Sequence, residues 1–388
     1  WRTHVKWSDW WENGRRYLDR GHPNASGGYY TQNEARELVA YAARKGITII
    51  PEIELPGHSA AVLAVYPELS CSGKPYAHTE YCVGKEQTSV FLMQVLNELI
   101  DIFPSEYIHI GGGEVHTNSW ASCQQCQALM EKEGLKEVMD LRGYMIKRID
   151  SLLRSKGKKL IGWDGILEGG ASAGTTVMSR QGQEFGLQAV NAGHPVIMAP
   201  QSYLSFDRYQ SEEDSHPQQN AEYTPLHQVY AYDPIPGALP ADKLGLILGA
   251  SGTVGTEYMA TWEQVEYMVF PRALALAEVV WSDPKKHNWT DFQQRLKQHY
   301  SLLQRFQVNY YRPSYTVGID VAFNADTLTN TISMSTEQLD LGIRYTTNGQ
   351  DPDIGSAMYT KPIELSVPAT VKAAFFIDSA RVGPIAKA

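Results

Sequence analysis

Three short motifs combine carboxylates, histidines and an aromatic ring at spacings that suit acid–base chemistry. They read PEIELPGH at residues 51–58, HIGGGE at residues 109–114 and IGWD at residues 161–164. Each motif lies at the end of a short apolar run that is typical of a buried β-strand. A positioned glutamate can donate or accept a proton at a reacting oxygen, so Glu114 is the first candidate for a general acid or base. Glu52 and Glu54 are two residues apart, which predicts that both side chains face the same side of a strand.

Alternating strands and amphipathic helices are predicted to position these motifs. Thr31 and Glu34 form a capping-box pattern before a helical stripe, and Gly46 is placed to end that helix. Short apolar strands are expected at residues 47–54, 107–111, 160–163, 175–178, 195–198 and 246–248. This order is typical of parallel βα units and predicts an α/β fold of the (β/α)8 TIM-barrel type. Six strands are found where a closed barrel has eight, so two are expected from material that precedes Trp1 or from a rearranged N-terminal segment.

The sequence predicts two domains. The barrel domain is expected at residues 1–312, because helical spacing persists to about residue 306. Residues 313–388 change to Thr-rich alternation with an Asn348-Gly349 turn signal, which favours a small C-terminal β-sandwich. A structural cap is the preferred role for this sandwich, ahead of a glycan-binding module.

Charge and hydropathy exclude two classes of partner. A formal charge of -9 provides no basic surface for phosphates, so nucleic acid is not expected as a partner. No apolar run approaches the roughly 20 residues needed to span a bilayer, so no membrane partner is expected either.

Four cysteines form two close pairs in the sequence. Cys71 with Cys82 and Cys123 with Cys126 are predicted to form disulfides, which implies an oxidising compartment and a periplasmic or secreted location. Buried free thiols are the alternative. Cys123 and Cys126 have the spacing of half a zinc site, but no second pair follows at suitable spacing, so no metal or other cofactor is expected.

The three motifs, in this order and spacing, resemble the family 20 glycoside hydrolases of the β-N-acetylhexosaminidase type. The similarity runs from Trp1 to about Trp281, and residues 343–376 resemble the C-terminal domain of bacterial members. The resemblance implies that Glu114 is the general acid/base, while the 2-acetamido oxygen of the substrate is the nucleophile. It implies that a β-linked amino-sugar glycan is bound by His58, Trp163, Asp207, Glu257 and Arg180.

Four pocket positions depart from the family pattern. Gly113 stands where the family has the Asp that orients the acetamido N–H, and Ser205 stands where it has a Tyr that bonds the acetamido carbonyl. Arg180 and Gly255 occupy positions of family tryptophans. Arg180 is expected either to pair with a carboxylate or to bind an anionic substituent. The changes predict an altered acetamido pocket with weak or changed activity.

Three interpretations are consistent with these departures. The chain is a glycosidase with an altered pocket, a non-catalytic carbohydrate-binding pseudoenzyme, or a barrel re-engineered to hold a new cavity. The glycosidase with an altered pocket is the favoured interpretation, and the other two are alternatives. The sequence does not specify whether activity survives, which sugar and linkage are recognised, or the oligomeric state.

Overall fold

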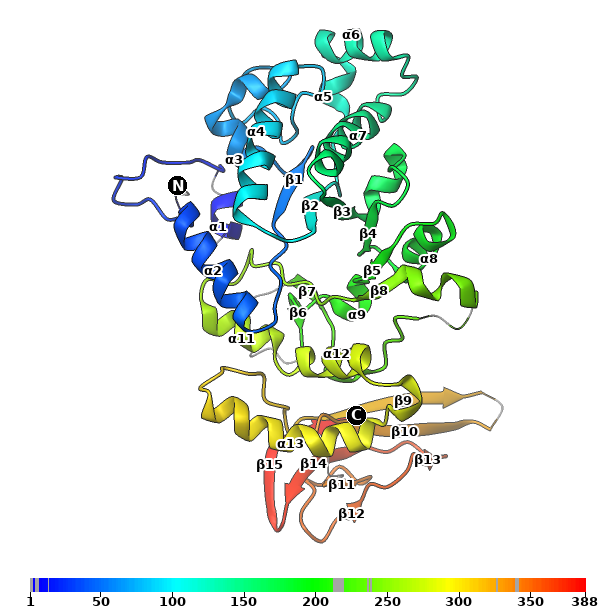
Figure 1. Ribbon diagram of the computed structural model, residues 1–388. Coiled ribbons are helices and arrows are strands. Elements are labelled where there is room, and N and C mark those ends of the chain that lie inside the picture. Colours follow the sequence, from blue (N-terminus) through cyan, green and yellow to red (C-terminus); the bar gives the residue numbers. More distant parts are fainter. Residues whose placement is uncertain are drawn as a thin grey trace. The chain divides into compact units, whose positions relative to one another are not determined.

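The chain forms two compact units, residues Trp1–Lys285 and Lys286–Ala388 (Figure 1). The computed structural model describes residues 3, 7–12, 14–211, 220–235, 237, 239–325, 327–338 and 342–388. The domain boundary expected at residue 312 stays a prediction. The two compact units divide between Lys285 and Lys286, so helix α13 (Trp289–Arg305) belongs to the second unit.

The first unit is built on a parallel six-stranded sheet in the order β1-β2-β3-β4-β5-β8. Its strands are β1 (Glu52–Leu55), β2 (Tyr107–Gly111), β3 (Lys159–Trp163), β4 (Thr176–Ser179), β5 (Val196–Met198) and β8 (Ile247–Ala250). The six predicted strands are therefore confirmed to within a few residues. The largest difference is at β1, which begins at Glu52 rather than at residue 47. β1 lies at the edge of this sheet and pairs only with β2 among the described strands. Pro51 precedes β1, although its carbonyl still accepts from the backbone N–H of His109 in β2 at 3.0 Å.

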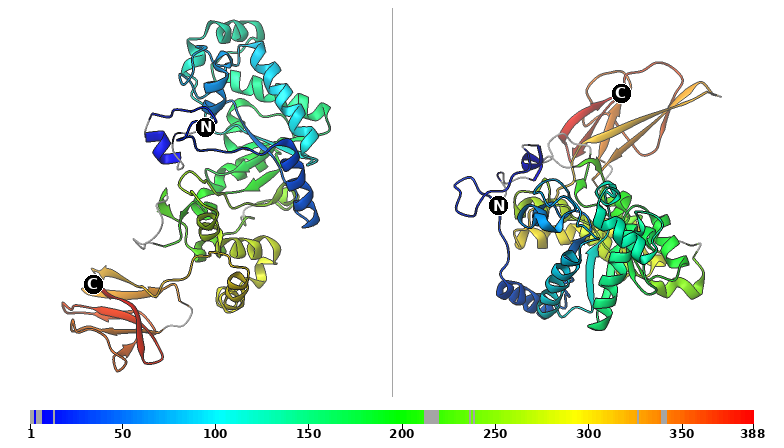
Figure 2. Two further views of the ribbon diagram at one scale, coloured as in Figure 1. Left: turned by 90° about the vertical axis from the view of Figure 1, so that its left-hand side faces the viewer. Right: turned by 90° about the horizontal axis from the view of Figure 1, so that it is seen from above.

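Helices follow these strands and cover the outer side of the sheet (Figure 2). α7 (Asp140–Ser155) packs against β3, and α8 (Gln183–Asn191) packs against β4 and β5. Leu141, Met145 and Ile149 recur at intervals of four and are buried, which is why this segment of α7 forms an amphipathic helix. The other helices of eight or more residues in this unit are α2 (Gln32–Arg44), α4 (Glu86–Ile102), α6 (Gln124–Glu133), α11 (Trp262–Val269) and α12 (Arg272–Trp281).

Short elements complete the first unit. The short helices are α1 (Trp7–Glu12), α3 (Ala60–Val65), η1 (Pro67–Leu69), α5 (Asn118–Ala121), η2 (Asp164–Gly169), α9 (Gln201–Leu204), α10 (Leu226–Tyr230), η3 (Ala241–Leu246) and η4 (Pro284–Lys286), the last of which spans the boundary between the units. Strands β6 (Arg208–Tyr209) and β7 (Asn220–Tyr223) pair separately from the main sheet. The predicted capping box is present, because the Thr31 hydroxyl accepts from the backbone of Glu34 and the Glu34 carboxylate accepts from the backbone of Thr31. No helix among the described residues is long and apolar enough to cross a membrane.

The second unit contains the predicted antiparallel sandwich. One sheet has the order β13-β10-β9 and the other has the order β12-β11-β14-β15. The strands are β9 (Val317–Asn324), β10 (Thr329–Thr336), β11 (Ile343–Thr346), β12 (Ala357–Met358), β13 (Ile363–Leu365), β14 (Lys372–Ile377) and β15 (Ala380–Lys387). Buried residues from both sheets form one core, which includes Val317, Ile332, Ile343 and Phe375. The chain bends at Asn348-Gly349 after β11, where Gly349 adopts a φ of 78° that suits glycine.

The two predicted disulfides are wrong. Cys71, Cys82, Cys123 and Cys126 are free thiols, and the closest sulfur atoms are 3.7 Å apart. A disulfide bond requires about 2.05 Å. The loops after β1 and β2 bring all four cysteines into one cluster, so close spacing in the sequence does not determine which thiols are neighbours.

Arg272 offers a test of this fold, because its side chain is completely buried and its hydrogen bonds to the described residues all go to backbone carbonyls. Its acceptors are the carbonyls of Phe206, Arg208, Thr224 and Met268. Arg272→Met should lower the free energy of unfolding by at least about 2 kcal/mol, because buried carbonyls lose their donors. Urea unfolding followed by tryptophan fluorescence measures this change. The exposed Arg36→Ala is the control and should change stability by no more than about 0.5 kcal/mol; equal effects of the two substitutions would contradict the role of Arg272.

Candidate active site at the carboxyl ends of the strands

In-register parallel pairing brings the three motifs to one edge of the sheet. Leu55 at the end of β1 lies opposite Gly111 at the end of β2, and Trp163 at the end of β3 lies opposite Met178 in β4. The carboxyl ends of parallel strands form the functional face of a barrel. The loops that carry His58, Glu114 and Arg180 therefore begin at this edge.

Glu52 on β1 contacts one residue of β2 and one of β3. Its Oε1 atom is 3.0 Å from Nε1 of Trp163 and 3.3 Å from Nδ1 of His109. The His109 and Trp163 rings also meet edge to face, with centroids 4.9 Å apart. The Trp163 ring is therefore fixed in orientation by Glu52 and His109, neither of which was among the predicted site residues. His109 is the first residue of the HIGGGE motif at the end of β2, and this place in the motif could have identified it as a site residue.

Glu54 is hydrogen-bonded to Glu52, which confirms that the two side chains face the same side of β1. Burial, with the charge and hydrogen bond of Glu52, raises the pKa of Glu54 to about 8, although backbone N–H groups of Gly113 and Gly112 oppose the rise. Burial also acts to raise the pKa of Glu52, but the hydrogen bond and charge of His109, helped by Trp163, lower it overall. At neutral pH the pair therefore holds one proton, on Glu54, because two adjacent buried carboxylates resist double ionisation.

Glu114 and His58 are brought together at the mouth of the strands. The Nε2 atom of His58 lies 3.9 Å from a carboxylate oxygen of Glu114, and its Nδ1 atom lies 3.6 Å from Oε1 of Glu54. The Glu114 side chain is 79% exposed, so it is accessible to a ligand. Gly57 lets the turn before His58 pack against the backbone of Glu114. A Cβ atom at position 57 would collide with the Glu114 carbonyl oxygen.

Gly113 is not required by the backbone. A Cβ atom at this position would lie 3.5 Å from Cδ1 of Trp163, an ordinary contact, and its φ is not in the left-handed region. Gly111 and Gly112 differ, since their φ values are 66° and 75°. Arg142 holds this turn by donating to the carbonyls of Gly112 and Gly113. A side chain at position 113 would therefore point along Trp163 without moving the chain.

A second group of charged residues forms around Gly255. A Cβ atom there would lie 2.5 Å from Oε2 of Glu257 and 3.1 Å from Oδ2 of Asp207, so both carboxylates converge on this glycine. Burial raises the pKa of Asp207, against the opposing effects of its own backbone N–H and the charge of Arg180. Asp207 Oδ1 is buried and has no partner among the described residues.

Arg180 lies between the two groups. Its backbone N–H donates to Oδ2 of Asp164 at 3.0 Å, and Gln181 donates to the same atom at 2.7 Å. The charge of Arg180 acts on both Asp164 and Asp207, yet no carboxylate among the described residues lies within ion-pair distance of its guanidinium. Asp164 thus connects β3 to β4. Asp164 ends the IGWD motif but was not among the predicted site residues.

Ser205 faces the strand framework rather than solvent. It is 2% exposed, its hydroxyl lies 3.5 Å from that of Thr253, and the two residues form a parallel bridge. No direct contact joins the Glu114 group to the Asp207 group among the described residues. They share only the edge of the sheet and the link through Asp164 and Arg180.

Comparison with known proteins identifies the family of the unit that contains this site. The profile of the glycosyl hydrolase family 20 catalytic domain matches residues 1–284, which is most of the chain. The chain belongs to glycosyl hydrolase family 20. The profile of the chitobiase/β-hexosaminidase C-terminal domain matches residues 324–384.

Individual relatives agree with this assignment. A β-hexosaminidase of Porphyromonas gingivalis is 38% identical over 368 residues, which are 92% of this chain and 47% of the relative. A β-hexosaminidase of Akkermansia muciniphila is 34% identical over 316 residues, covering 76% of this chain and 62% of the relative. The crystal structure of a family 20 exo-β-N-acetylglucosaminidase from Vibrio harveyi in complex with N-acetylglucosamine has a TM-score of 0.69 at 31% identity, covering 76% of this chain and 48% of that one.

The family 20 assignment confirms the predicted TIM-type barrel with a C-terminal domain of antiparallel sheets. The described residues contribute six parallel strands of that barrel. The chain spans about half the length of the curated relatives it matches first.

The shared proton of Glu52 and Glu54 predicts a pH dependence of stability. The pKa of Glu54 is raised to about 8 in the folded chain, above its ordinary value of 4.5. Its contribution to stability is therefore fully present below about pH 4.5 and is lost as the pH rises through about 8. The melting temperature should fall across this range, and Glu54→Gln should flatten the fall. An unchanged pH profile in Glu54→Gln would contradict the assignment of the proton to Glu54.

Proposed function

We propose that the chain is the catalytic part of an exo-acting glycosidase that removes terminal β-linked N-acetylhexosamines, with Glu114 as general acid/base. The observation that carries the proposal is the place of Glu114. It follows β2 at the carboxyl edge of the sheet, within 3.9 Å of His58, and the residue before it lies against Trp163. A sugar that packs on Trp163 would therefore present its glycosidic oxygen toward Glu114.

The hydroxyl side of the proposed pocket is formed by Asp207 and Glu257. Their carboxylates converge at Gly255, and carboxylate oxygens accept hydrogen bonds from sugar hydroxyls. Arg180 extends this side with a guanidinium that has no ion-pair partner among the described residues. We therefore favour its binding of an anionic substituent over a structural salt bridge.

The acetamido side of the pocket is predicted to be impaired. Gly113 has no carboxylate to orient the acetamido N–H or to offset the positive charge that develops on it, and Ser205 places a small buried hydroxyl where the family has a Tyr. The loss of one preorganised electrostatic partner typically costs about a hundred- to a thousand-fold in rate. The proposed activity is therefore weak.

Carbohydrate binding without turnover is the second candidate function. Two observations favour it. Gly113 provides no carboxylate for the acetamido group, whereas Asp207 still provides a carboxylate near Gly255 that could bind a sugar hydroxyl. A re-engineered cavity has no supporting observation in the structure. A periplasmic or secreted location also remains a proposal, and the free thiols remove the disulfide argument that supported it.

Glu114→Gln separates the catalytic from the binding role. Hydrolysis of a chromogenic β-N-acetylglucosaminide by the parent chain should be slow, and Glu114→Gln should reduce it by about a hundred-fold or more. Glu106→Gln is the matched control, because Glu106 precedes β2 at its opposite end and forms an exposed ion pair with Lys159. No turnover by the parent chain, with sugar binding retained, would favour the binding protein; ordinary turnover of about 1 per second or faster would contradict the impaired pocket.

Gly113→Asp tests the missing acetamido partner directly. The ordinary contact at position 113 predicts that this variant folds with the stability of the parent. Its kcat/KM should rise by less than about tenfold, because residues that act as a unit do not restore activity singly. Measured kcat/KM and melting temperature check both expectations. Recovery of full family-like activity from this one substitution would show that Ser205 and Gly255 are not part of the defect.

A further inference from the structure

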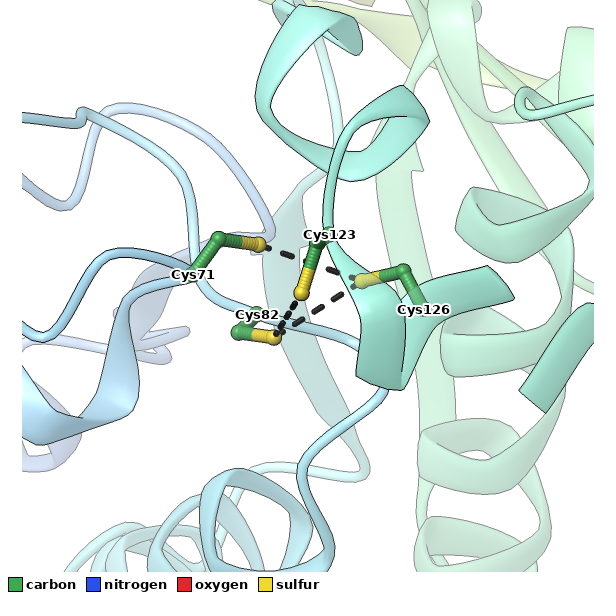
Figure 3. A group of neighbouring side chains, drawn as sticks. All are labelled: Cys71, Cys82, Cys123 and Cys126. Carbon is green, nitrogen blue, oxygen red and sulfur yellow. Dashed lines mark hydrogen bonds between the residues drawn. The ribbon is translucent and has the colours of Figure 1, made fainter. Parts of the chain in front are cut away.

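The four cysteines of the chain converge from two loops that follow β1 and β2. Cys71 and Cys82 come from the segment between η1 and α4, while Cys123 and Cys126 lie at the start of α6. Figure 3 shows the four side chains pointing toward one another. Their sulfur atoms all lie within 4.8 Å of one another. Cys82 and Cys126 are completely buried, whereas Cys71 and Cys123 are partly exposed.

The distances between the sulfur atoms match tetrahedral coordination of a single ion. Cys82 Sγ is 3.7 Å from both Cys123 Sγ and Cys126 Sγ, and Cys71 Sγ is 3.9 Å from Cys126 Sγ. Four thiolates at about 2.3 Å from a central zinc ion are about 3.8 Å from one another in a regular tetrahedron. A cluster of several iron atoms would hold its thiolates farther apart.

The backbone around the cluster is arranged to support thiolates. The N–H group of Gly84 donates to Sγ of Cys126, which is the kind of outer contact that orients metal ligands. Gly84 is required for this approach, because a Cβ atom there would lie 2.3 Å from the carbonyl carbon of Gln125. The expectation of no metal site rested on the absence of a cysteine pair after Cys126, whereas Cys71 and Cys82, the second pair of the cluster, precede Cys123 in the sequence.

We infer that Cys71, Cys82, Cys123 and Cys126 form a structural zinc site that joins the loops after β1 and β2. Four thiolates close the coordination shell and leave no open position, so the ion stabilises the fold and does not act on substrate. Zinc prefers this ligand set, whereas calcium and magnesium require oxygen ligands.

The site lies in the loops that position His58 and Glu114. The backbone N–H of Tyr81 donates to the Pro56 carbonyl at 2.9 Å, and that of Ser59 donates to the Thr79 carbonyl at 2.7 Å. The Trp120 indole then donates to the Tyr81 carbonyl at 2.9 Å, which connects the second loop to the first. A zinc ion bound next to Cys82 would therefore fix the Pro56–Ser59 turn, and with it His58.

The test is the metal content of the full chain, purified without chelators. Inductively coupled plasma mass spectrometry should find one zinc per chain, and X-ray absorption at the zinc edge should show four sulfur neighbours at about 2.3 Å. Chain produced in cobalt-supplemented medium should show the visible bands of tetrahedral cobalt thiolate. None of these measurements depends on glycosidase activity.

Variants locate the ion. Cys71→Ser replaces a partly exposed ligand and should reduce the zinc content and the melting temperature, whereas Gln125→Ala, between two ligands on the exposed side of α6, should change neither. Absence of zinc from the parent chain even after incubation with zinc salts would overturn the inference. Two disulfides found by mass spectrometry in the native chain, or iron in place of zinc, would overturn it as well.

Discussion

Parallel pairing of β1, β2 and β3 is the constraint on which the proposed site depends. Glu52 and Glu54 on β1 reach His109 on β2, Trp163 on β3 and the glycine turn after β2 because Glu52 pairs with His109 and the register shifts once before Leu55 pairs with Gly111. A shift of one residue in β1 would turn both carboxylates to the opposite face of the sheet. The proton shared by the two glutamates, the orientation of the Trp163 ring and the contact between His58 and Glu114 all follow from this register.

Two buried arginines stabilise the turns at the ends of the strands. Arg142 donates to the carbonyls of Gly112 and Gly113, and Arg272 donates to those of Phe206 and Arg208 on either side of Asp207. A buried guanidinium is costly unless its donors find acceptors. Arg272 finds them in backbone carbonyls, and Arg142 finds them in backbone carbonyls and in the carboxylate of Glu168. Each arginine thus fixes a backbone segment that carries a pocket position. The side chain at position 113 is free to vary because Arg142 holds the backbone and not the side chain.

Much of the fold was predictable because it is encoded locally. Apolar runs predicted the six parallel strands, and the capping box at Thr31 predicted the start of α2. The cysteine cluster was not predictable in this way, since its members come from two loops and the pairing by closeness in sequence is wrong. His109 and Asp164 were missed for the same reason. Their partners, Glu52 on one side and the N–H groups of Arg180 and Gln181 on the other, lie on neighbouring strands.

The most direct test of the account is a crystal structure of the chain with N-acetylglucosamine bound. We predict a sugar ring packed on Trp163, with its anomeric oxygen about 2.6–3.2 Å from the Glu114 carboxylate. Its hydroxyls should reach Asp207 and Glu257, and its acetamido group should lie beside Gly113 without a carboxylate partner. A sugar bound away from Trp163, or a Glu114 carboxylate directed away from the anomeric oxygen, would contradict the assignment of Glu114 as the general acid.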